Sequence, residues 1–198
     1  MFKKLALYGA GGHASEVVAQ LKTVNYQSIK LFVDEQYVAE GLSSIKEFNA
    51  EEYLMMIPVS DSVSREKMVR KLPEETEYWT FIHPTALLMD NETIKLGKGC
   101  FIGAYSILTT DIEIGDHAIL NRGVHIGHGS RIGNFFSAMP SSVVSGDVVI
   151  GNNVYLGTNA SVKEKINICN GVTIGMNSPV HHNITESGIY VGDNLRKI

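Results

Sequence analysis

A six-residue repeat runs through the second half of this chain. Every sixth residue is apolar over fifteen consecutive hexads: Leu96, Ile102, Leu108, Ile114, Leu120, Ile126, Ile132, Ala138, Val144, Ile150, Leu156, Val162, Ile168, Ile174 and Val180. Because 44% of the chain is apolar, so long a run would arise by chance about once in 10^5 trials. A period of six fits neither one helix face nor the simple alternation of a strand. It is typical of a short strand followed by a turn.

The other hexad positions support this interpretation. The next residue is glycine in eight hexads, which suits a corner: Gly97, Gly103, Gly115, Gly127, Gly133, Gly151, Gly157 and Gly175. No residue four positions after the apolar one is charged, so two positions per hexad can fill an interior. Three hexads close one triangular coil, and fifteen hexads make five coils stacked at strand spacing. The sequence therefore predicts a parallel β-helix.

Some apolar residues fall on positions that point out of this predicted prism. They are Tyr105, Ile119, Phe135 and Tyr155. We expect the chain to self-associate through its outward faces, although single surface hydrophobes are also normal.

The first 80 or so residues follow a different pattern. Apolar strand-like runs (residues 5–8, 29–33, 54–59 and 78–82) alternate with stretches of helical spacing (residues 16–21 and 62–72). Such alternation predicts a small parallel sheet with helices on its faces, which is a Rossmann-like α/β domain. We therefore divide the chain into residues 1–82 and residues 83–198.

A glycine-rich turn follows the first predicted strand. Residues 9–14 read Gly-Ala-Gly-Gly-His-Ala, a partial dinucleotide fingerprint in which Ala14 occupies the third glycine position. Glycines let the backbone approach a phosphate, and the start of the next helix offers free N–H groups to an anion. Asp34, which follows the second predicted strand, could accept hydrogen bonds from a ribose or a base. A tight turn without a ligand is the alternative.

Composition narrows the choice of partners and compartment. The net charge of −4 and the pI near 6.0 provide no basic surface for nucleic acid. No apolar stretch reaches the length of a signal-peptide core or a membrane span, so we expect a cytoplasmic protein without membrane contact. Cys100 occupies an inward hexad position more than three coils from Cys169, which makes a disulfide between them implausible. Lys163, Lys165, Arg131 and Arg196 are candidates for contact with a phosphate-rich ligand, although ordinary solvated side chains are the alternative.

Together these features resemble the NeuD/PglD-type sugar acyltransferases of bacteria. The resemblance covers the hexapeptide prism, the opening Tyr-Gly-Ala-Gly-Gly-His of residues 8–13 and the junction Ile-His-Pro-Thr-Ala of residues 82–86. It implies a left-handed β-helix, a homotrimer and acetyl-CoA as donor. It also implies N-acetylation of a UDP- or dTDP-linked 4-amino-6-deoxy sugar by direct attack in a ternary complex. The implied setting is the assembly of a surface glycan such as lipopolysaccharide O-antigen.

The resemblance assigns two catalytic residues. In the family an asparagine precedes the histidine base by seven residues, and Asn121 and His128 match this spacing. Histidine suits a general base because its unperturbed pKa is near 6.5. We expect His128 at a corner and His125 pointing outward from a strand. His117, His181 and His182 read as surface or trimer-contact residues, and histidines so scattered predict no metal site.

The family pattern also suggests binding residues. Ser137, Gly146, Gly175 and Met176 match positions near the acetyl-CoA arm, and Gly11, Gly12, His13, Asp34 and Ser60 match positions that bind the nucleotide sugar. Ser137 stands where relatives have a second histidine. Met176 replaces a glycine, and residues 191–195 replace a Gly-x-Pro-Ala turn, so we expect acetyl-CoA to be held somewhat differently.

A further departure concerns the histidine base. Relatives follow it with Asp or Glu, whereas Gly129 follows His128. Either the acceptor amine arrives neutral, or Asp116 or another carboxylate substitutes from a neighbouring coil or chain. A histidine without its carboxylate favours an amine over a sugar hydroxyl, so O-acetylation, for example of sialic acid, is the second choice. A non-catalytic trimeric scaffold that binds a nucleotide sugar is the third choice, and a metal-dependent hydratase is disfavoured.

Overall fold

The computed structural model describes residues 3–26 and 28–198. The N-terminal unit contains β1 (Lys4–Tyr8), α1 (Gly12–Thr23), β2 (Ile29–Val33), η1 (Glu35–Tyr37), β3 (Ser43–Ser44), η2 (Ile45–Glu47), β4 (Tyr53–Met56) and α2 (Ser62–Val69). Its four strands form a parallel sheet in the order β3-β2-β1-β4. The predicted alternation of strand and helix is confirmed. β3 was not predicted, because two serines carry no apolar pattern.

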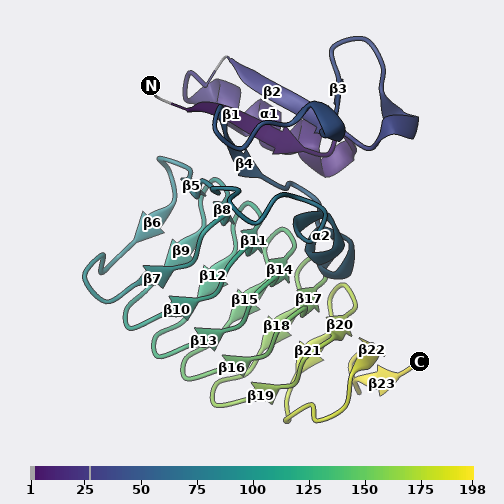
Figure 1. Ribbon diagram of the computed structural model, residues 1–198. Coiled ribbons are helices and arrows are strands. Elements are labelled where there is room, and N and C mark those ends of the chain that lie inside the picture. The colour runs from purple at the N-terminus through teal and green to yellow at the C-terminus, as the bar shows by residue number, and fades with distance from the viewer. Residues whose placement is uncertain (1–2, 27) are drawn as a thin grey trace.

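The rest of the chain is a three-sided parallel β-helix (Figure 1). Its first face contains β5 (Phe81–Ile82), β8 (Phe101–Ile102), β11 (Ile119–Leu120), β14 (Ser137–Ala138), β17 (Tyr155–Leu156), β20 (Val172–Ile174), β22 (Gly188–Val191) and the antiparallel β23 (Arg196–Lys197). The second contains β6 (Leu87–Leu88), β9 (Ile107–Leu108), β12 (His125–Ile126), β15 (Val143–Val144), β18 (Ser161–Val162) and β21 (Pro179–Val180). The third contains β7 (Lys95–Leu96), β10 (Glu113–Ile114), β13 (Arg131–Ile132), β16 (Val149–Ile150) and β19 (Asn167–Ile168).

The register of the prism follows the hexads. Ile114 pairs with Leu96 on one side and with Ile132 on the other, a shift of three hexads each way. The hexad residues and those four positions later form one continuous buried core. Inward serines are satisfied by corner carbonyls, as where Ser106 donates to the carbonyl of Asn121 at 3.0 Å. The first strand of the prism begins at Phe81, close to the predicted domain boundary.

A ladder of polar side chains stacks along the corner between the third and first faces. Oδ1 of Asn134 accepts a hydrogen bond from the backbone N–H of Asp116 at 2.8 Å, and Asn152 does the same for Asn134 at 2.7 Å. A Cβ on Gly115 would lie 2.3 Å from Oδ1 of Asn134. Glycine is therefore needed here to give room to the ladder, and φ of Gly115 is not in the left-handed region.

The N-terminal unit packs on the first face of the prism. Figure 1 shows its sheet and α1 above the early coils and α2 beside β14 and β17. Val17 and Leu21 of α1 share an apolar cluster with Phe101 and Ile119 of the prism. Ile119 is only 1% exposed, so it holds the two units together. The expectation that it serves self-association is wrong.

The other three outward residues divide in the same way. Tyr155 is half-buried against the same apolar cluster, and Phe135 stacks on His117 with ring centroids 5.2 Å apart. Tyr105 is exposed. Of the four, Tyr105 is therefore the most exposed to a second chain in the described structure.

Arg65 of α2 fastens the two units together. The side chain is 1% exposed, and its guanidinium donates to the carbonyls of His117 at 2.8 Å and Phe135 at 2.8 Å. It also bonds Oγ of Ser137 at 2.9 Å and the carbonyl of Val59. Five N–H donors in a planar fork suit such a set of acceptors. Burial lowers the pKa of this group, which lies among carbonyl dipoles.

His117 is buried between two rings, not exposed as the sequence suggested. Tyr78 contacts it edge-on with centroids 4.5 Å apart, and Phe135 stacks on its other side. His117 is 2% exposed, and its Nδ1 has no hydrogen-bond partner among the described residues. Burial lowers the pKa of His117 to about 4.

This shift makes stability depend on pH. In the unfolded chain His117 takes up a proton near pH 6.5, whereas in the folded chain its ring stays neutral until about pH 4. The free energy of unfolding should therefore fall as the pH drops through this window, by up to about 3 kcal/mol. Urea unfolding from pH 7 to pH 4.5 measures it. His117→Phe should reduce this slope, His125→Gln should not, and equal slopes for His117→Phe and the parent chain would contradict the prediction.

Two smaller expectations concern cysteines and membranes. Cys100 is buried as predicted, and both it and Cys169 are free. Among the residues that the structure describes, no helix has the length and apolar character needed to cross a membrane.

Candidate functional site

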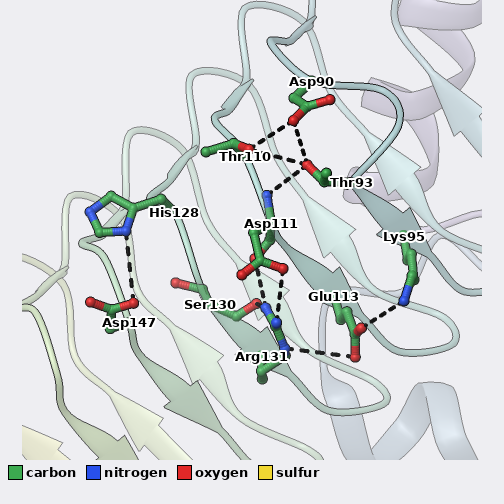
Figure 2. A network of polar contacts seen from close by, with 10 residues as sticks. All are labelled: Asp90, Thr93, Lys95, Thr110, Asp111, Glu113, His128, Ser130, Arg131 and Asp147. Atoms are coloured by element: carbon green, nitrogen blue, oxygen red, sulfur yellow. Dashed lines mark hydrogen bonds and ion pairs between the residues drawn. The ribbon is translucent and has the colours of Figure 1, made fainter.

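His128 lies on the corner between β12 and β13, where its side chain is 64% exposed. Its Nδ1 is 3.8 Å from Oδ1 of Asp147, which occupies the next coil. Figure 2 shows the ring with its other nitrogen directed away from Asp147. The arrangement leaves Nε2 available to a reactant while a carboxylate faces Nδ1. Asp116 does not fill this role, since it belongs to the ladder on another corner.

Gly146 forms the surface on which the histidine ring rests. It is buried, and a Cβ at this position would lie 2.5 Å from Nε2 of His128 and 2.6 Å from Cε1. The resemblance suggested that this glycine gives room to acetyl-CoA. In the structure it gives room to the ring of His128, and its contact with acetyl-CoA stays a prediction.

A polar network stiffens the same corner in the two coils before His128 (Figure 2). Asp90 accepts hydrogen bonds from Thr93 at 2.7 Å and Thr110 at 2.9 Å. Arg131 bonds both the backbone carbonyl and the carboxylate of Asp111. The carbonyl of Thr110 in turn accepts from the N–H of Gly129 at 3.2 Å. The loop that carries His128 is thereby tied to a braced neighbour, and no sequence motif had indicated this network.

The other predicted prism residues lie elsewhere. Asn121 is buried on the corner between the first and second faces, where its Oδ1 accepts from the N–H of Arg122. Gly175 and the exposed Met176 lie on that same corner three coils later in the stack. Within one chain, strand β12 therefore separates Asn121 from His128.

Ser137 does not lie where the resemblance placed it. Its side chain is 0% exposed beneath α2, where Oγ donates to the carbonyl of Ser60 at 2.7 Å and accepts from Arg65. It therefore helps to join the two units and has no surface to offer to acetyl-CoA in the described structure. The predicted contact between Ser137 and acetyl-CoA is therefore wrong.

The N-terminal unit holds a cavity of about 430 Å³ at the carboxyl ends of β1 and β2. It is lined by Tyr8, Gly9, Ala10, Gly11, Val33, Asp34, Tyr37, Leu42 and Met68. Gly9 has φ of 124°, which an L-residue rarely adopts, and Gly11 caps α1 without a side chain. The first turn of α1 carries no acidic residue, so its N–H groups and dipole favour an anion.

Asp34 is held at the edge of this cavity. Its Oδ1 accepts a hydrogen bond from the hydroxyl of Tyr8, and Lys71 lies 2.9 Å and 3.0 Å from its two oxygens. The bond from Tyr8, together with Lys71, lowers the pKa of Asp34. Asp34 is therefore an ionised acceptor in a fixed position.

Three predicted sugar-site residues do not line the cavity. Gly12 is exposed at the start of α1, and Ser60 contributes its carbonyl to the junction with the prism. His13 packs edge-on against Phe101 at 6.2 Å, and its buried Nε2 has no partner. Burial lowers the pKa of His13. Among residues 3–26 and 28–198, no group of three or more potential metal ligands converges.

Comparison with known families matches both units. The PglD N-terminal domain matches residues 4–72, the bacterial transferase hexapeptide with six repeats matches residues 93–128, and the hexapeptide repeat of succinyl-transferase matches residues 147–181. The chain thus combines a PglD N-terminal domain with hexapeptide repeats. The PglD domain carries the cavity, and the hexapeptide domain carries His128.

Individual relatives share both domains. The GDP-perosamine N-acetyltransferase of Escherichia coli O157:H7 is 24% identical over 178 residues, which span 81% of this chain and 78% of the relative. PerB from Caulobacter crescentus, crystallised with CoA and GDP-perosamine, matches with a TM-score of 0.85 at 23% identity and covers 100% of this chain and 98% of its own. WeeI from Acinetobacter baumannii AYE matches with a TM-score of 0.87 at 21% identity and complete coverage of both chains.

Proposed function

We propose that this protein transfers the acetyl group of acetyl-CoA to the amino group of a nucleotide-linked amino sugar. The observation that carries the proposal is the pair of sites: a helix N-terminus with a cavity and Asp34 in one domain, and an exposed His128 with a carboxylate neighbour in the other. The names of the E. coli and Caulobacter relatives support the same reaction class. The specific acceptor we favour is the 4-amino group of a 6-deoxy sugar.

The chemistry needs one base and a stable anchor for each substrate. The amine nitrogen attacks the thioester carbonyl carbon, the carbon–sulfur bond breaks, and the sulfur departs with the bonding electrons. Nε2 of His128 accepts the proton that the amine sheds and delivers it to the sulfur, which completes the thiol. The base returns to its starting state. No covalent acyl-enzyme is required.

We place the acetyl-CoA arm beside His128 along the corner between the second and third faces. Lys163 and Lys165 are exposed on this corner below His128 and offer positive charge to phosphates. We place the nucleotide in the PglD-domain cavity, with its diphosphate at the start of α1 and its base or ribose near Asp34. These residues fit both anionic substrates.

The two sites of one chain lie on different sides of the prism. The PglD domain covers the first face, whereas His128 lies on the corner away from it. The second face exposes apolar side chains, including Leu87 at 49% and Val143 at 37%. A homotrimer with the second faces around its axis would bring the Asn121 corner of one protomer to the His128 corner of the next. We propose that the site is completed in this way.

A hydroxyl acceptor is the second candidate. The sequence had favoured an amine because His128 seemed to lack a carboxylate, but Asp147 supplies one at 3.8 Å. A base with such support suits an alcohol as well as an amine. The choice between N- and O-acetylation therefore depends on the acceptor itself.

Release of free thiol from acetyl-CoA tests the proposal. The panel contains GDP-, UDP- and dTDP-linked 4-amino-6-deoxy sugars, each beside the matching sugar with a hydroxyl at the same carbon. Thiol release with amino sugars alone is the expected result and also identifies the nucleotide. Release with the hydroxyl sugars would establish O-acetylation, and nucleotide binding without any thiol release would establish the non-catalytic scaffold.

Gly146→Ala tests the support of the base. The added methyl group would collide with the ring of His128, so we expect kcat to fall about tenfold or more without loss of the fold. Gly12→Ala is the control for the effect of a glycine-to-alanine change on folding alone, because its Cβ would meet no atom within 4 Å. Steady-state kinetics of Gly146→Ala and thermal unfolding of both variants give the answer. An unchanged kcat in Gly146→Ala would mean that the ring position is unimportant.

A further inference from the structure

One column of corner residues runs past the ring of His128. Residues 111, 129, 147 and 165 occupy the same corner position in successive coils, and they are Asp, Gly, Asp and Lys. Their φ values are 51°, 68°, 58° and 60°, so all four share the left-handed conformation. The column therefore holds a carboxylate one coil above and one coil below Gly129, which directly follows the histidine.

The two carboxylates of the column face different partners. Asp111 binds Arg131 at 2.9 Å, so its charge is engaged on the side of the third face. Asp147 is 48% exposed, and the one basic side chain within 4 Å of its carboxylate among the described residues is His128, whose Nδ1 lies 3.8 Å from Oδ1. Asp147 is therefore the carboxylate that is free to act on the histidine.

Gly129 makes this approach possible. A Cβ on residue 129 would lie 2.2 Å from Oδ1 of Asp147, so any other residue would push that carboxylate aside. The space left by the glycine side chain is thus filled by an oxygen from the next coil. A carboxylate at residue 129 and the present one at residue 147 are mutually exclusive in this geometry.

We propose that Asp147 is the positioning residue of the base, presented to His128 across the coil spacing because residue 129 is glycine. The inference rests on the proposed acyl transfer. Asp147 accepts a hydrogen bond from Nδ1–H of the ring, which fixes the tautomer whose Nε2 is unprotonated and turned toward the reactants. Small closure of the 3.8 Å gap on substrate binding makes the hydrogen bond, as is common in catalytic pairs.

A carboxylate swap between coils tests the proposal. Asp147→Asn and Asp147→Gly should each lower kcat about tenfold or more, with the KM for acetyl-CoA changed less than about threefold. Gly129→Asp combined with Asp147→Gly should restore kcat to within about threefold of the parent, because residue 129 then has space and a φ that Asp111 already adopts. Gly129→Asp alone should have a lower kcat than the parent, because the new side chain clashes with Asp147.

Glu164→Gln is the matched control for loss of one negative charge. It lies exposed on the same corner one coil beyond Asp147 and should leave kcat unchanged. Parent-like kcat in Asp147→Asn, or a double variant no faster than Asp147→Gly, would overturn the proposal.

A second readout works without any turnover. In ¹⁵N NMR of the parent protein, the neutral His128 ring should show the Nδ1–H tautomer, and Asp147→Asn should shift it toward the Nε2–H form. The parent and Glu164→Gln should give the same spectrum. If the parent transferred no acetyl group but Asp147→Asn still changed the tautomer of His128, the proposed function would be wrong. The contact between Asp147 and His128 would nevertheless be supported. If the tautomer of His128 were unchanged in Asp147→Asn, the proposed contact itself would be overturned.

Discussion

Replacing His128 by alanine should lower kcat for acetyl transfer by at least 100-fold, because a positioned base contributes 10²- to 10⁴-fold. The side chain is on the surface with Nε2 free, so nothing in the core depends on it. The folded state and the KM for the nucleotide sugar should change little. Thiol release at saturating acetyl-CoA measures kcat, and circular dichroism confirms the fold.

His182→Ala is the matched control for His128→Ala. It removes an exposed imidazole from the equivalent corner position three coils later and should keep kcat within about twofold of the parent. A loss below about tenfold in His128→Ala would exclude this residue as the general base. Equal losses in both variants would point to a shared effect on the surface of this corner.

Arg65→Met should lower the free energy of unfolding by about 3–5 kcal/mol, because several buried acceptors lose their donor and each unsatisfied buried group costs about 1–3 kcal/mol. The variant would leave buried acceptors at His117, Phe135 and Ser137 without their donor. Methionine has a similar length and no charge, so most of the loss reflects missing hydrogen bonds. Urea unfolding at pH 7 measures it.

The single tryptophan of the chain sharpens that experiment. Trp79 is buried in the apolar cluster between the two units, so its fluorescence reports their separation. In Arg65→Met the fluorescence transition should precede the loss of β-helix circular dichroism. Arg70→Met, which removes an exposed arginine of the ion pair with Glu66, should change stability by about 0.5 kcal/mol or less. Parent-like unfolding of Arg65→Met would show that packing alone joins the units.

The prism was predictable because its signal is local and repeated. Each hexad places one apolar residue inward, and errors in single hexads do not alter the register of Ile114 with its neighbours in the adjacent coils. β2 was predicted with its observed bounds, Ile29–Val33, because an apolar run bounded by polar residues needs no distant information. The two-residue β3 offered no such run.

Arg65 and His117 show where the sequence was insufficient. On a short helix rich in polar residues, Arg65 reads as a surface charge, yet carbonyls up to 71 positions later bury it. His117 occupies a turn position, and it is buried by Tyr78 from the other domain. Neither contact follows from local pattern, since both depend on how two separately patterned units dock.

The candidate site was predictable in part. The position of His128 on a corner followed from its place in the hexad, and this is confirmed. Asp147 was missed because it lies in the next coil, far from His128 in sequence. Residues 129 and 147 occupy equivalent hexad positions one coil apart, and this equivalence was the signal that could have found it.

The corner column that contains Gly129 and Asp147 affects how equivalent residues are identified when two such β-helix proteins are compared. In a chain that climbs by three hexads per coil, a carboxylate can reach the same point in space from either of two sequence positions. If Asp147 positions His128 as proposed, two substitutions are enough to move this functional group between coils without altering the site. A sequence alignment would show the carboxylate as lost. A comparison of residues at equivalent corner positions in neighbouring coils would show that it is preserved.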